Sequence, residues 1–207
     1  MLHLEAVDAP TLGLLKKLMN VPFFQPLRLV GRTSLALQYG HRKSIDLDLF
    51  GSFIPDEIEI GAAITELVVP FNWLNKSKNI KSLLIDGIKT DIVNYTYPWI
   101  GNLLQFDTLR LADTKDIAAM KLSAITGRGT KKDFTDLYFL LKHYSLGDMM
   151  EMYTQKYADG SVFMVLKSLT YFEDAESDEM PEMMVPVKWE EIRKVITENH
   201  NQYVKSL

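Results

Sequence analysis

Among its 207 residues the sequence has no cysteine, which excludes disulfide frameworks, Cys-based zinc sites and thiol nucleophiles. Long hydrophobic runs are also missing. The mainly apolar stretch at residues 67–74 is much shorter than the roughly 20 residues that span a bilayer. The N-terminal residues MLHLEAVDAP have neither a cationic start nor an apolar centre. We therefore expect no secretory signal, no membrane partner and a cytoplasmic location.

Charge of one sign is not in large excess, because 23 Lys and Arg stand against 27 Asp and Glu, a net charge of −4. General binding to polyanions is thus excluded, and any contact with nucleic acid requires a local basic patch. No internal repeat and no linker rich in Gly, Ser or Pro divides the chain. With 47% hydrophobic and 24% charged residues, the composition is that of a globular protein with one or two domains.

Hydrophobic periodicity and turn residues separate a mixed α/β part from a helical part. The dipeptide Asp86-Gly87 between two strand-like runs predicts a β-hairpin. The predicted strands are 27–30, 45–50, 80–85 and 88–95, and the predicted helices are 10–19, 33–39, 56–67, 113–126, 131–144 and 189–204. We therefore predict an α+β protein, with a mixed sheet flanked by helices in residues 1–105 and a helical domain in residues 106–207.

Two carboxylates share one face of the predicted strand 45–50. Side chains alternate along a strand, so Asp46 and Asp48 point away from its apolar residues. Neighbouring carboxylates repel, so a cation between them would stabilise the arrangement, and Mg²⁺ takes one or two carboxylates together with phosphate oxygens. The alternative is a half-exposed strand whose polar face is acidic. Asp91, on the second hairpin strand, would complete a three-carboxylate site if its strand lies alongside.

The segment before this strand predicts a site for an anion. Strand 27–30 leads into Gly31 and a short helix, and the start of a helix presents free N–H groups to a negative charge. An anion-binding turn next to a divalent-cation site is the layout that nucleoside triphosphate chemistry requires.

A lysine interrupts the apolar face of the predicted helix 113–126. Lys121 either extends along this face to solvent or reaches a phosphate. Arg128 follows on the same face and is itself followed by lysines at positions 131 and 132, a cluster suited to polyphosphate or RNA. Asp133 and Asp136 open the next helix, where early carboxylates also stabilise the helix N-terminus.

These segments together resemble a known family. VGRTSLALQYGHRKSIDLDLF looks like the nucleotidyltransferase motif of the AbiEii/AbiGii abortive-infection toxins, and DIAAMKLSAITGRGTKKDFTDLYFLL resembles their downstream helical motif. The order also matches: a Gly turn, Asp-x-Asp, a third Asp, a Lys, and a Lys-Asp-x-x-Asp run. The resemblance implies a DNA polymerase β-like nucleotidyltransferase domain followed by a helical domain.

The resemblance also implies a mechanism and partners. Mg²⁺ would be held by Asp46, Asp48 and Asp91, which align the α-phosphate of a nucleoside triphosphate with an acceptor hydroxyl. Family members act as toxins beside an antitoxin protein, and some relatives add nucleotides to the 3′ end of tRNA, so RNA is the expected acceptor. The implied catalytic residues are Asp46, Asp48, Asp91, Lys121 and Asp133, and those expected to contact the nucleotide are Gly31, Arg32, Thr33, Ser34, Arg42, Lys121, Arg128 and Asp136.

One position departs from the family pattern. The family has a small residue after the first glycine, where this chain has Arg32. A small residue lets the backbone approach the triphosphate closely, so Arg32 either blocks that approach or itself contacts the phosphates. Two alternatives therefore stay open: a nucleotidyltransferase acting on a small molecule such as an aminoglycoside, or a degenerate module that binds a nucleotide or partner without turnover.

Overall fold

A computed structural model of the chain describes residues 1–52 and 56–207 and divides them into two compact units. Unit 1 comprises Met1–Tyr97 and Asn102–Ala112, and unit 2 comprises Pro98–Gly101 and Asp113–Leu207. Residues 106–112, which the sequence analysis grouped with the helices, belong to unit 1 because they pair with its sheet. That the two units are separate domains stays a prediction.

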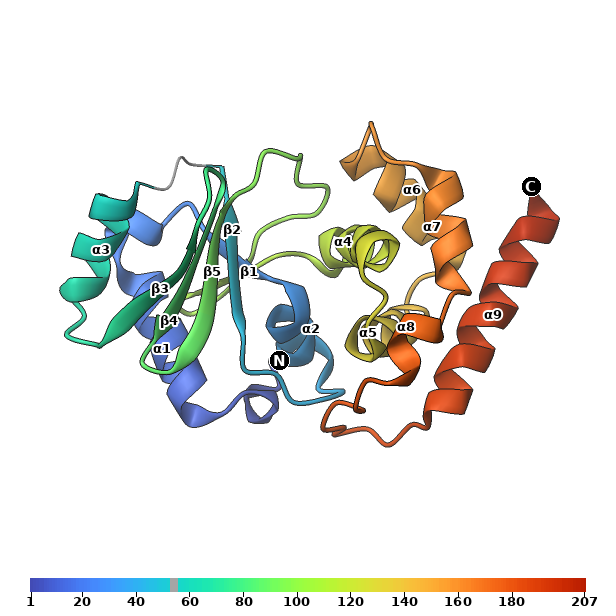
Figure 1. Ribbon diagram of the computed structural model, residues 1–207, viewed down its shortest axis with the longest axis horizontal. Coiled ribbons are helices and arrows are strands. Elements are labelled where there is room, and N and C mark those ends of the chain that lie inside the picture. The colour runs from blue at the N-terminus through green and yellow to red at the C-terminus, as the bar shows by residue number, and fades with distance from the viewer. Residues whose placement is uncertain (53–55) are drawn as a thin grey trace. The chain divides into compact units, whose positions relative to one another are not determined.

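Unit 1 is built on a mixed sheet of seven strands in the order β3-β4-β5-β2-β1-β7-β6. The β2 strand pairs in parallel with β5 and antiparallel with β1, so it lies near the middle of the sheet (Figure 1). The strands are β1 (Arg28–Val30), β2 (Leu47–Gly51), β3 (Phe71–Lys76), β4 (Ile80–Ile85), β5 (Ile88–Asn94), β6 (Leu104–Phe106) and β7 (Leu109–Leu111).

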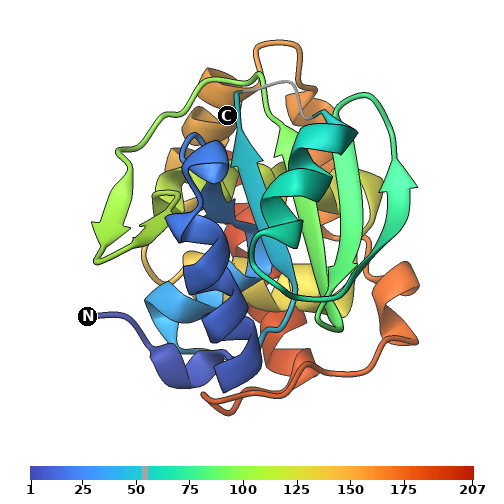
Figure 2. The same cartoon turned by 90° about the vertical axis from the view of Figure 1, so that its left-hand side faces the viewer.

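Helices α1 (Ala9–Asn20) and α3 (Glu57–Thr65) cover one face of this sheet, as Figure 2 shows. The core on that face combines helix residues such as Leu15 and Ile64 with inward-facing strand residues such as Leu49 and Ile92, all buried. Helix α2 (Gly31–Tyr39) follows β1, and single 3₁₀ turns occur at Leu4–Ala6 and Pro22–Phe24. Because strand side chains alternate, the residues between the core positions of β2 and β5 point to the other face.

A buried arginine fixes the chain just before β1. The guanidinium of Arg110 in β7 donates hydrogen bonds of 2.9–3.0 Å to the carbonyl oxygens of Met19, Phe24 and Leu27. Burial lowers the pKa of Arg110. One side chain thus satisfies three carbonyl groups at the entrance to β1, the strand that leads into the Gly31 turn.

Most of the elements predicted for unit 1 are confirmed, with differences at particular residues. Asp86 (φ 49°) and Gly87 (φ 79°) form the predicted hairpin turn between β4 and β5. The prediction that this strand starts at Ile45, on the same face as Leu47, was wrong, because β2 begins at Leu47 and Ile45 is exposed. Strands β3, β6 and β7 were missed; β6 and β7 are only three residues long, too short for a clear alternation.

Unit 2 is helical, with α4 packed against α5, α6 and α7, and α9 against α5, α6 and α7 (Figure 1). The helices are α4 (Thr114–Gly127), α5 (Lys131–Leu140), α6 (Leu146–Lys156), α7 (Val162–Leu169), α8 (Glu173–Glu176) and α9 (Trp189–Ser206). Rings of Phe134, Phe172 and Trp189 meet at centroid distances of 4.9–5.9 Å between α5, α8 and α9. In the described ranges, no helix combines the length and apolarity that crossing a bilayer demands.

A buried ion pair ties the segment Pro98–Gly101 into unit 2. Asp116 Oδ1 accepts a 2.6 Å hydrogen bond from Lys156 Nζ, and both side chains are fully buried. The same carboxylate accepts bonds from the backbone N–H groups of Ile100 (3.0 Å) and Gly101 (2.9 Å). The Lys156 ammonium also donates to Pro98 O and lies 4.6 Å from the centre of the Trp99 ring. The charge pair and four residues of chain therefore form one network.

Candidate active site

The turn at Gly31 lies directly against Asp48, one of the expected carboxylates. Gly31 begins α2 with a φ of 67°, a backbone conformation that residues other than glycine rarely adopt. A Cβ atom at this position would lie 2.3 Å from Asp48 Oδ2. Glycine is thus required both by the backbone conformation and by the close approach of Asp48.

Asp48 and Asp91 are neighbours across the sheet. Their Cα atoms are register partners in the parallel pairing of β2 with β5, where adjacent strands lie roughly 4.8 Å apart. Both belong to the set of residues that alternates with the apolar core positions, so they share the sheet face opposite α1 and α3. Topology therefore brings together two carboxylates that are 43 positions apart in sequence.

One oxygen of Asp91 is left available to a ligand. Asp91 Oδ2 accepts a 2.6 Å hydrogen bond from Lys89 Nζ, whereas Oδ1 is buried and has no hydrogen-bond partner among the described residues. A buried acceptor without a partner costs roughly 1–3 kcal/mol. A bound cation next to Asp48 would relieve this cost.

Asp46 is engaged by the arginine that departs from the family pattern. Asp46 Oδ2 and Arg32 Nη2 form an ion pair at 2.9 Å, with the Asp46 side chain 31% and the Arg32 side chain 22% exposed. Asp46 lies before the first residue of β2, so the strand does not fix its side chain as it fixes Asp48. The structure thus brings Asp48 and Asp91 together and holds Asp46 against α2.

Two hydroxyl groups expected to contact the nucleotide are used inside the unit. Thr33 Oγ1 donates to the carbonyl oxygen of Asp46 and shares a 2.8 Å hydrogen bond with Ser44 Oγ. Ser34 Oγ accepts a 3.1 Å bond from Gln38 Nε2, and both Thr33 and Ser34 are buried. Their direct contact with a phosphate stays a prediction. Thr33 already fixes the backbone that carries Asp46.

The carboxylates of unit 1 fit a magnesium ion that takes part of its shell from a substrate. Across residues 1–52 and 56–207, no group of three or more Asp, Glu or His side chains lies close enough to hold a metal ion. Mg²⁺ does not need such a cage, since it binds through one or two carboxylates with phosphate oxygens and water. Asp48 and the unpaired oxygen of Asp91 supply that minimum.

In unit 2, Lys121 forms a buried cluster with the two aspartates that open α5. Its Nζ lies 2.9 Å from Asp133 Oδ1 and 2.6 Å from Asp136 Oδ2, and its side chain is only 6% exposed. The interpretation that Lys121 extends to solvent was therefore wrong. One ammonium between two carboxylates leaves the cluster with a formal charge of −1.

The surroundings of Asp133 lower the pKa of its carboxyl group. Burial alone would raise it, but the charge of Lys121 and hydrogen bonds from Thr130 and Lys121 outweigh burial, so the pKa is lowered. The Thr130 hydroxyl donates to Asp133 Oδ2 at 2.6 Å and also caps α5. Because Asp133 stays ionised, its charge can hold the Lys121 ammonium in a fixed position.

The remaining basic residues differ widely in exposure. Arg128 is 67% exposed, with its Nε 3.9 Å from Asp133 Oδ2, so its predicted role in binding phosphate is sterically possible. Arg42 is 2% exposed and donates to the carbonyl of Lys43. Lys131 is also buried and donates to the carbonyl oxygens of Glu176 and Asp178. Arg42 and Lys131 therefore do not belong to a basic surface patch.

Comparison with known proteins gives the family to which the chain belongs. The family described as "Nucleotidyl transferase AbiEii toxin, Type IV TA system" matches residues 13–105 and 84–203. The chain belongs to the AbiEii family of nucleotidyltransferase toxins. The predicted family is therefore confirmed, and the chain is a nucleotidyltransferase of the toxin type.

Relatives of this AbiEii-family chain cover nearly its full length. An uncharacterized protein of Aquifex aeolicus, aq_aa25, is 36% identical over 93% of this chain and 95% of its own length. Among solved structures, MenT4, a nucleotidyltransferase toxin of Mycobacterium tuberculosis, has a TM-score of 0.59 at 15% identity, covering 94% of this chain and 86% of its own. JHP933 from Helicobacter pylori has a TM-score of 0.57 at 18% identity, covering 97% and 96%. These structures confirm the predicted fold class.

Sequence reasoning missed three residues that contact the expected site residues. Ser44 supports Thr33, Thr130 binds Asp133, and Lys89 pairs with Asp91. The pairing of Lys89 could have been inferred, because residues two apart on a strand share a face. No sequence pattern indicated Ser44, whose partner is 11 residues away on another element.

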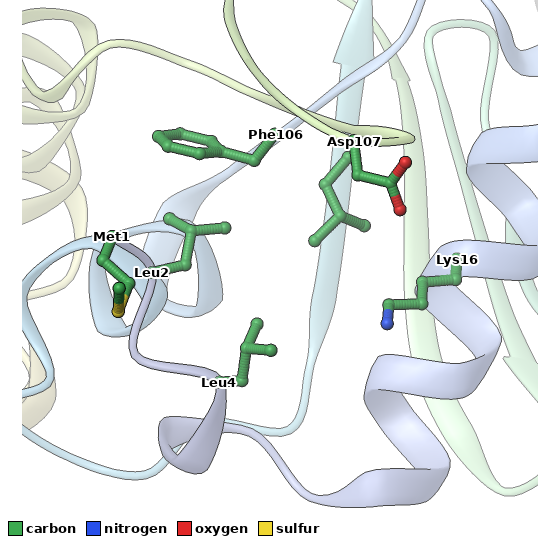
Figure 3. A pocket seen from close by; sticks show the side chains of 7 residues that line it. Met1, Leu2, Leu4, Lys16, Phe106 and Asp107 are labelled. Atoms are coloured by element: carbon green, nitrogen blue, oxygen red, sulfur yellow. The ribbon is translucent and has the colours of Figure 1, made fainter.

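A separate hollow in unit 1 contains none of these groups. It has a volume of about 360 Å³ and is lined mainly by apolar side chains including Leu2, Leu4 and Phe106, with Lys16 and Asp107 at its edge (Figure 3). One Asp side chain and one Lys side chain do not resemble the paired aspartates Asp48 and Asp91. We assign no step of nucleotidyl transfer to it.

Proposed function

We propose that this toxin-family nucleotidyltransferase moves a nucleoside monophosphate from a nucleoside triphosphate to a hydroxyl of RNA, with tRNA as the acceptor, in a reaction that depends on Mg²⁺. The observation that carries the proposal is the register of Asp48 with Asp91 beside Gly31, together with the family match. A metal-binding carboxylate pair next to a helix start combines a cation site with an anion site.

Each part of the site then has a separate task. Asp48 and Asp91, joined by Asp46, would hold Mg²⁺, which supplies charge stabilisation at the reacting phosphate when bound. The first turn of α2, starting at Gly31, would orient the triphosphate through backbone N–H groups, since the side chain of its N-cap residue Val30 cannot accept a hydrogen bond.

The family resemblance also assigns roles to the buried cluster of unit 2. We infer that Lys121 holds the carboxylates of Asp133 and Asp136 in place, and its contact with the phosphates stays a prediction from the family resemblance. The lowered pKa makes Asp133 a weak base, so we propose that Asp133 acts through its charge, by holding Lys121 in place. Arg128, exposed beside Asp133, would add a mobile phosphate contact.

Family membership also supports a partner. The AbiEii family belongs to type IV toxin–antitoxin systems. We therefore propose that an antitoxin protein restrains this chain, and that the chain acts in the cytoplasm, where triphosphates and tRNA are found.

The test is transfer of label from each of the four α-³²P nucleoside triphosphates to purified tRNA or total RNA in the presence of Mg²⁺. We expect label in RNA from one or more of them. Asp48→Asn should reduce the rate by at least about 100-fold, the loss typical when an electrostatic contact to the transition state is removed. Chelation of Mg²⁺ should have the same effect.

A matched control makes the same chemical change away from the site. Asp86→Asn alters an exposed turn residue, and Asn-Gly supports the same hairpin turn as Asp-Gly, so transfer should be unchanged. Label that appears only on a small polyhydroxylated amine, such as an aminoglycoside, would instead favour the small-molecule acceptor. No transfer to any acceptor by folded protein would contradict the proposal.

A further inference from the structure

Asp46 and Asp91, two of the expected metal-binding carboxylates, each pair with a cation of the chain itself. Arg32 Nη2 lies 2.9 Å from Asp46 Oδ2, and Lys89 Nζ lies 2.6 Å from Asp91 Oδ2. Asp46 therefore has a counter-ion before any metal arrives. This pairing agrees with the finding that no three carboxylates converge in the described part of the chain.

Arg32 lies where a bound triphosphate would compete with Asp46 for its guanidinium. Arg32 is the second residue of α2, in the turn that starts at Gly31 and whose N–H groups face a bound anion in the proposed function. Both partners are partly exposed, and ion pairs of this kind contribute only about 0–1 kcal/mol. A triphosphate is a stronger partner for a guanidinium than one solvated carboxylate, because it offers several charged oxygens in a bidentate geometry.

We infer that Arg32 exchanges partners during the reaction cycle: it pairs with Asp46 in the free protein and with the triphosphate in the bound protein, which releases Asp46 for Mg²⁺. This inference rests on the proposed function and assigns a role to the residue that departs from the family pattern. It makes the binding of nucleotide and of metal interdependent, because each ligand removes an obstacle to the other.

A residue that exchanges partners has effects of opposite sign on the two ligands. Removing Arg32 frees Asp46 permanently, so metal alone should bind more tightly. The same change removes a phosphate contact, so nucleotide should bind more weakly. A residue that only stabilises the fold would weaken both.

The first measurement is Mn²⁺ binding to the nucleotide-free protein, followed by the electron paramagnetic resonance signal of free Mn²⁺. We expect Arg32→Ala to bind Mn²⁺ about 5-fold tighter than the natural protein, the lower end of typical coupling between sites. Lys17→Ala is the matched control, since it removes one positive charge from an exposed position of α1 in the same unit. It should leave Mn²⁺ affinity unchanged.

The second measurement is binding of the α,β-methylene analogues of ATP, CTP, GTP and UTP, with Mg²⁺ present, by isothermal titration calorimetry. Whichever analogue binds the natural protein should bind Arg32→Ala about 5- to 10-fold more weakly. Arg32→Lys keeps the charge and should restore part of the affinity. Urea midpoints of all variants establish that they are equally folded.

The outcomes separate this inference from the function on which it rests. Unchanged or weaker Mn²⁺ binding by folded Arg32→Ala, or unchanged analogue binding, would overturn the exchange and leave nucleotidyl transfer standing. If the natural protein binds neither Mn²⁺ nor any analogue, the proposed function falls and the exchange falls with it.

Discussion

Breaking the buried pair of Asp116 and Lys156 should destabilise unit 2 more than any exposed ion pair. Both side chains are fully buried, and Asp116 accepts three hydrogen bonds, one of them from Lys156 at 2.6 Å. Lys156→Met leaves a buried carboxylate with only two backbone N–H donors. Loss of one partner of a buried pair typically costs about 3–5 kcal/mol, which is the decrease in unfolding free energy that we expect.

The same network predicts a non-additive double variant. Asp116→Asn alone leaves the Lys156 ammonium buried beside Pro98 O and the Trp99 ring, and its amide cannot accept from both Ile100 and Gly101. In the double variant neither charge is left without its partner. Its decrease in unfolding free energy should therefore be smaller than the sum of the two single decreases by about 2 kcal/mol.

The assay is urea unfolding followed by tryptophan fluorescence. A Trp73→Phe background removes the tryptophan of unit 1, so the signal comes from Trp99 and Trp189 in unit 2. Lys194→Met serves as the control, because its 3.9 Å pair with Glu198 is exposed and should contribute less than about 0.5 kcal/mol. The reasoning would be refuted if Lys156→Met lowered the unfolding free energy by less than about 1 kcal/mol, or if the decreases of the two single variants simply added up in the double variant.

Two further predictions concern the site itself. Gly31→Ala should lower the unfolding free energy by about 2 kcal/mol and abolish transfer, because φ is 67° and the new Cβ would lie 2.3 Å from Asp48 Oδ2. Gly13→Ala, in α1 with no atom within 4 Å of its Cβ, should instead stabilise by about 0.5–1 kcal/mol in the same urea assay; a loss at both positions would contradict this account. The pKa of Asp133 is lower in the folded protein than in the unfolded chain, where it is about 3.9. The charge of Asp133 therefore stabilises the fold at pH values above about 3.9, and this contribution is lost as the pH falls through the folded-state pKa. The unfolding free energy of Asp133→Asn, measured from pH 2.5 to 7, should therefore fall less steeply below pH 4 than that of the natural protein, and equal slopes would argue against the ionised cluster.

The local elements of the site were predictable because their causes are local. Alternation around Asp48, the Asp86-Gly87 turn and the helix that ends at Gly40 all depend on residues within a few positions of one another. The family, too, could be predicted from the order of the motifs, and the match confirms it.

Strand order and ion pairing required the tertiary structure, because both depend on partners that are distant in sequence. From the sequence, Asp91 could join the other carboxylates only if its strand lay beside β2. The parallel pairing of β2 with β5 places Asp91 next to Asp48. Likewise, Lys121 interrupts an apolar face in a way that fits either solvent or a phosphate, until Asp133 and Asp136 are placed around it.

Arg32 illustrates this division most directly. The sequence alone determined that a large cation replaces a small residue in the Gly turn, and that carboxylates lie 14 and 16 positions further along the chain. Only the folded chain decided that the guanidinium meets Asp46 rather than Asp48. The physical reason is that Asp48 is fixed by the pleat of β2 against Gly31, whereas Asp46 precedes the strand and lies within reach of the first turn of α2.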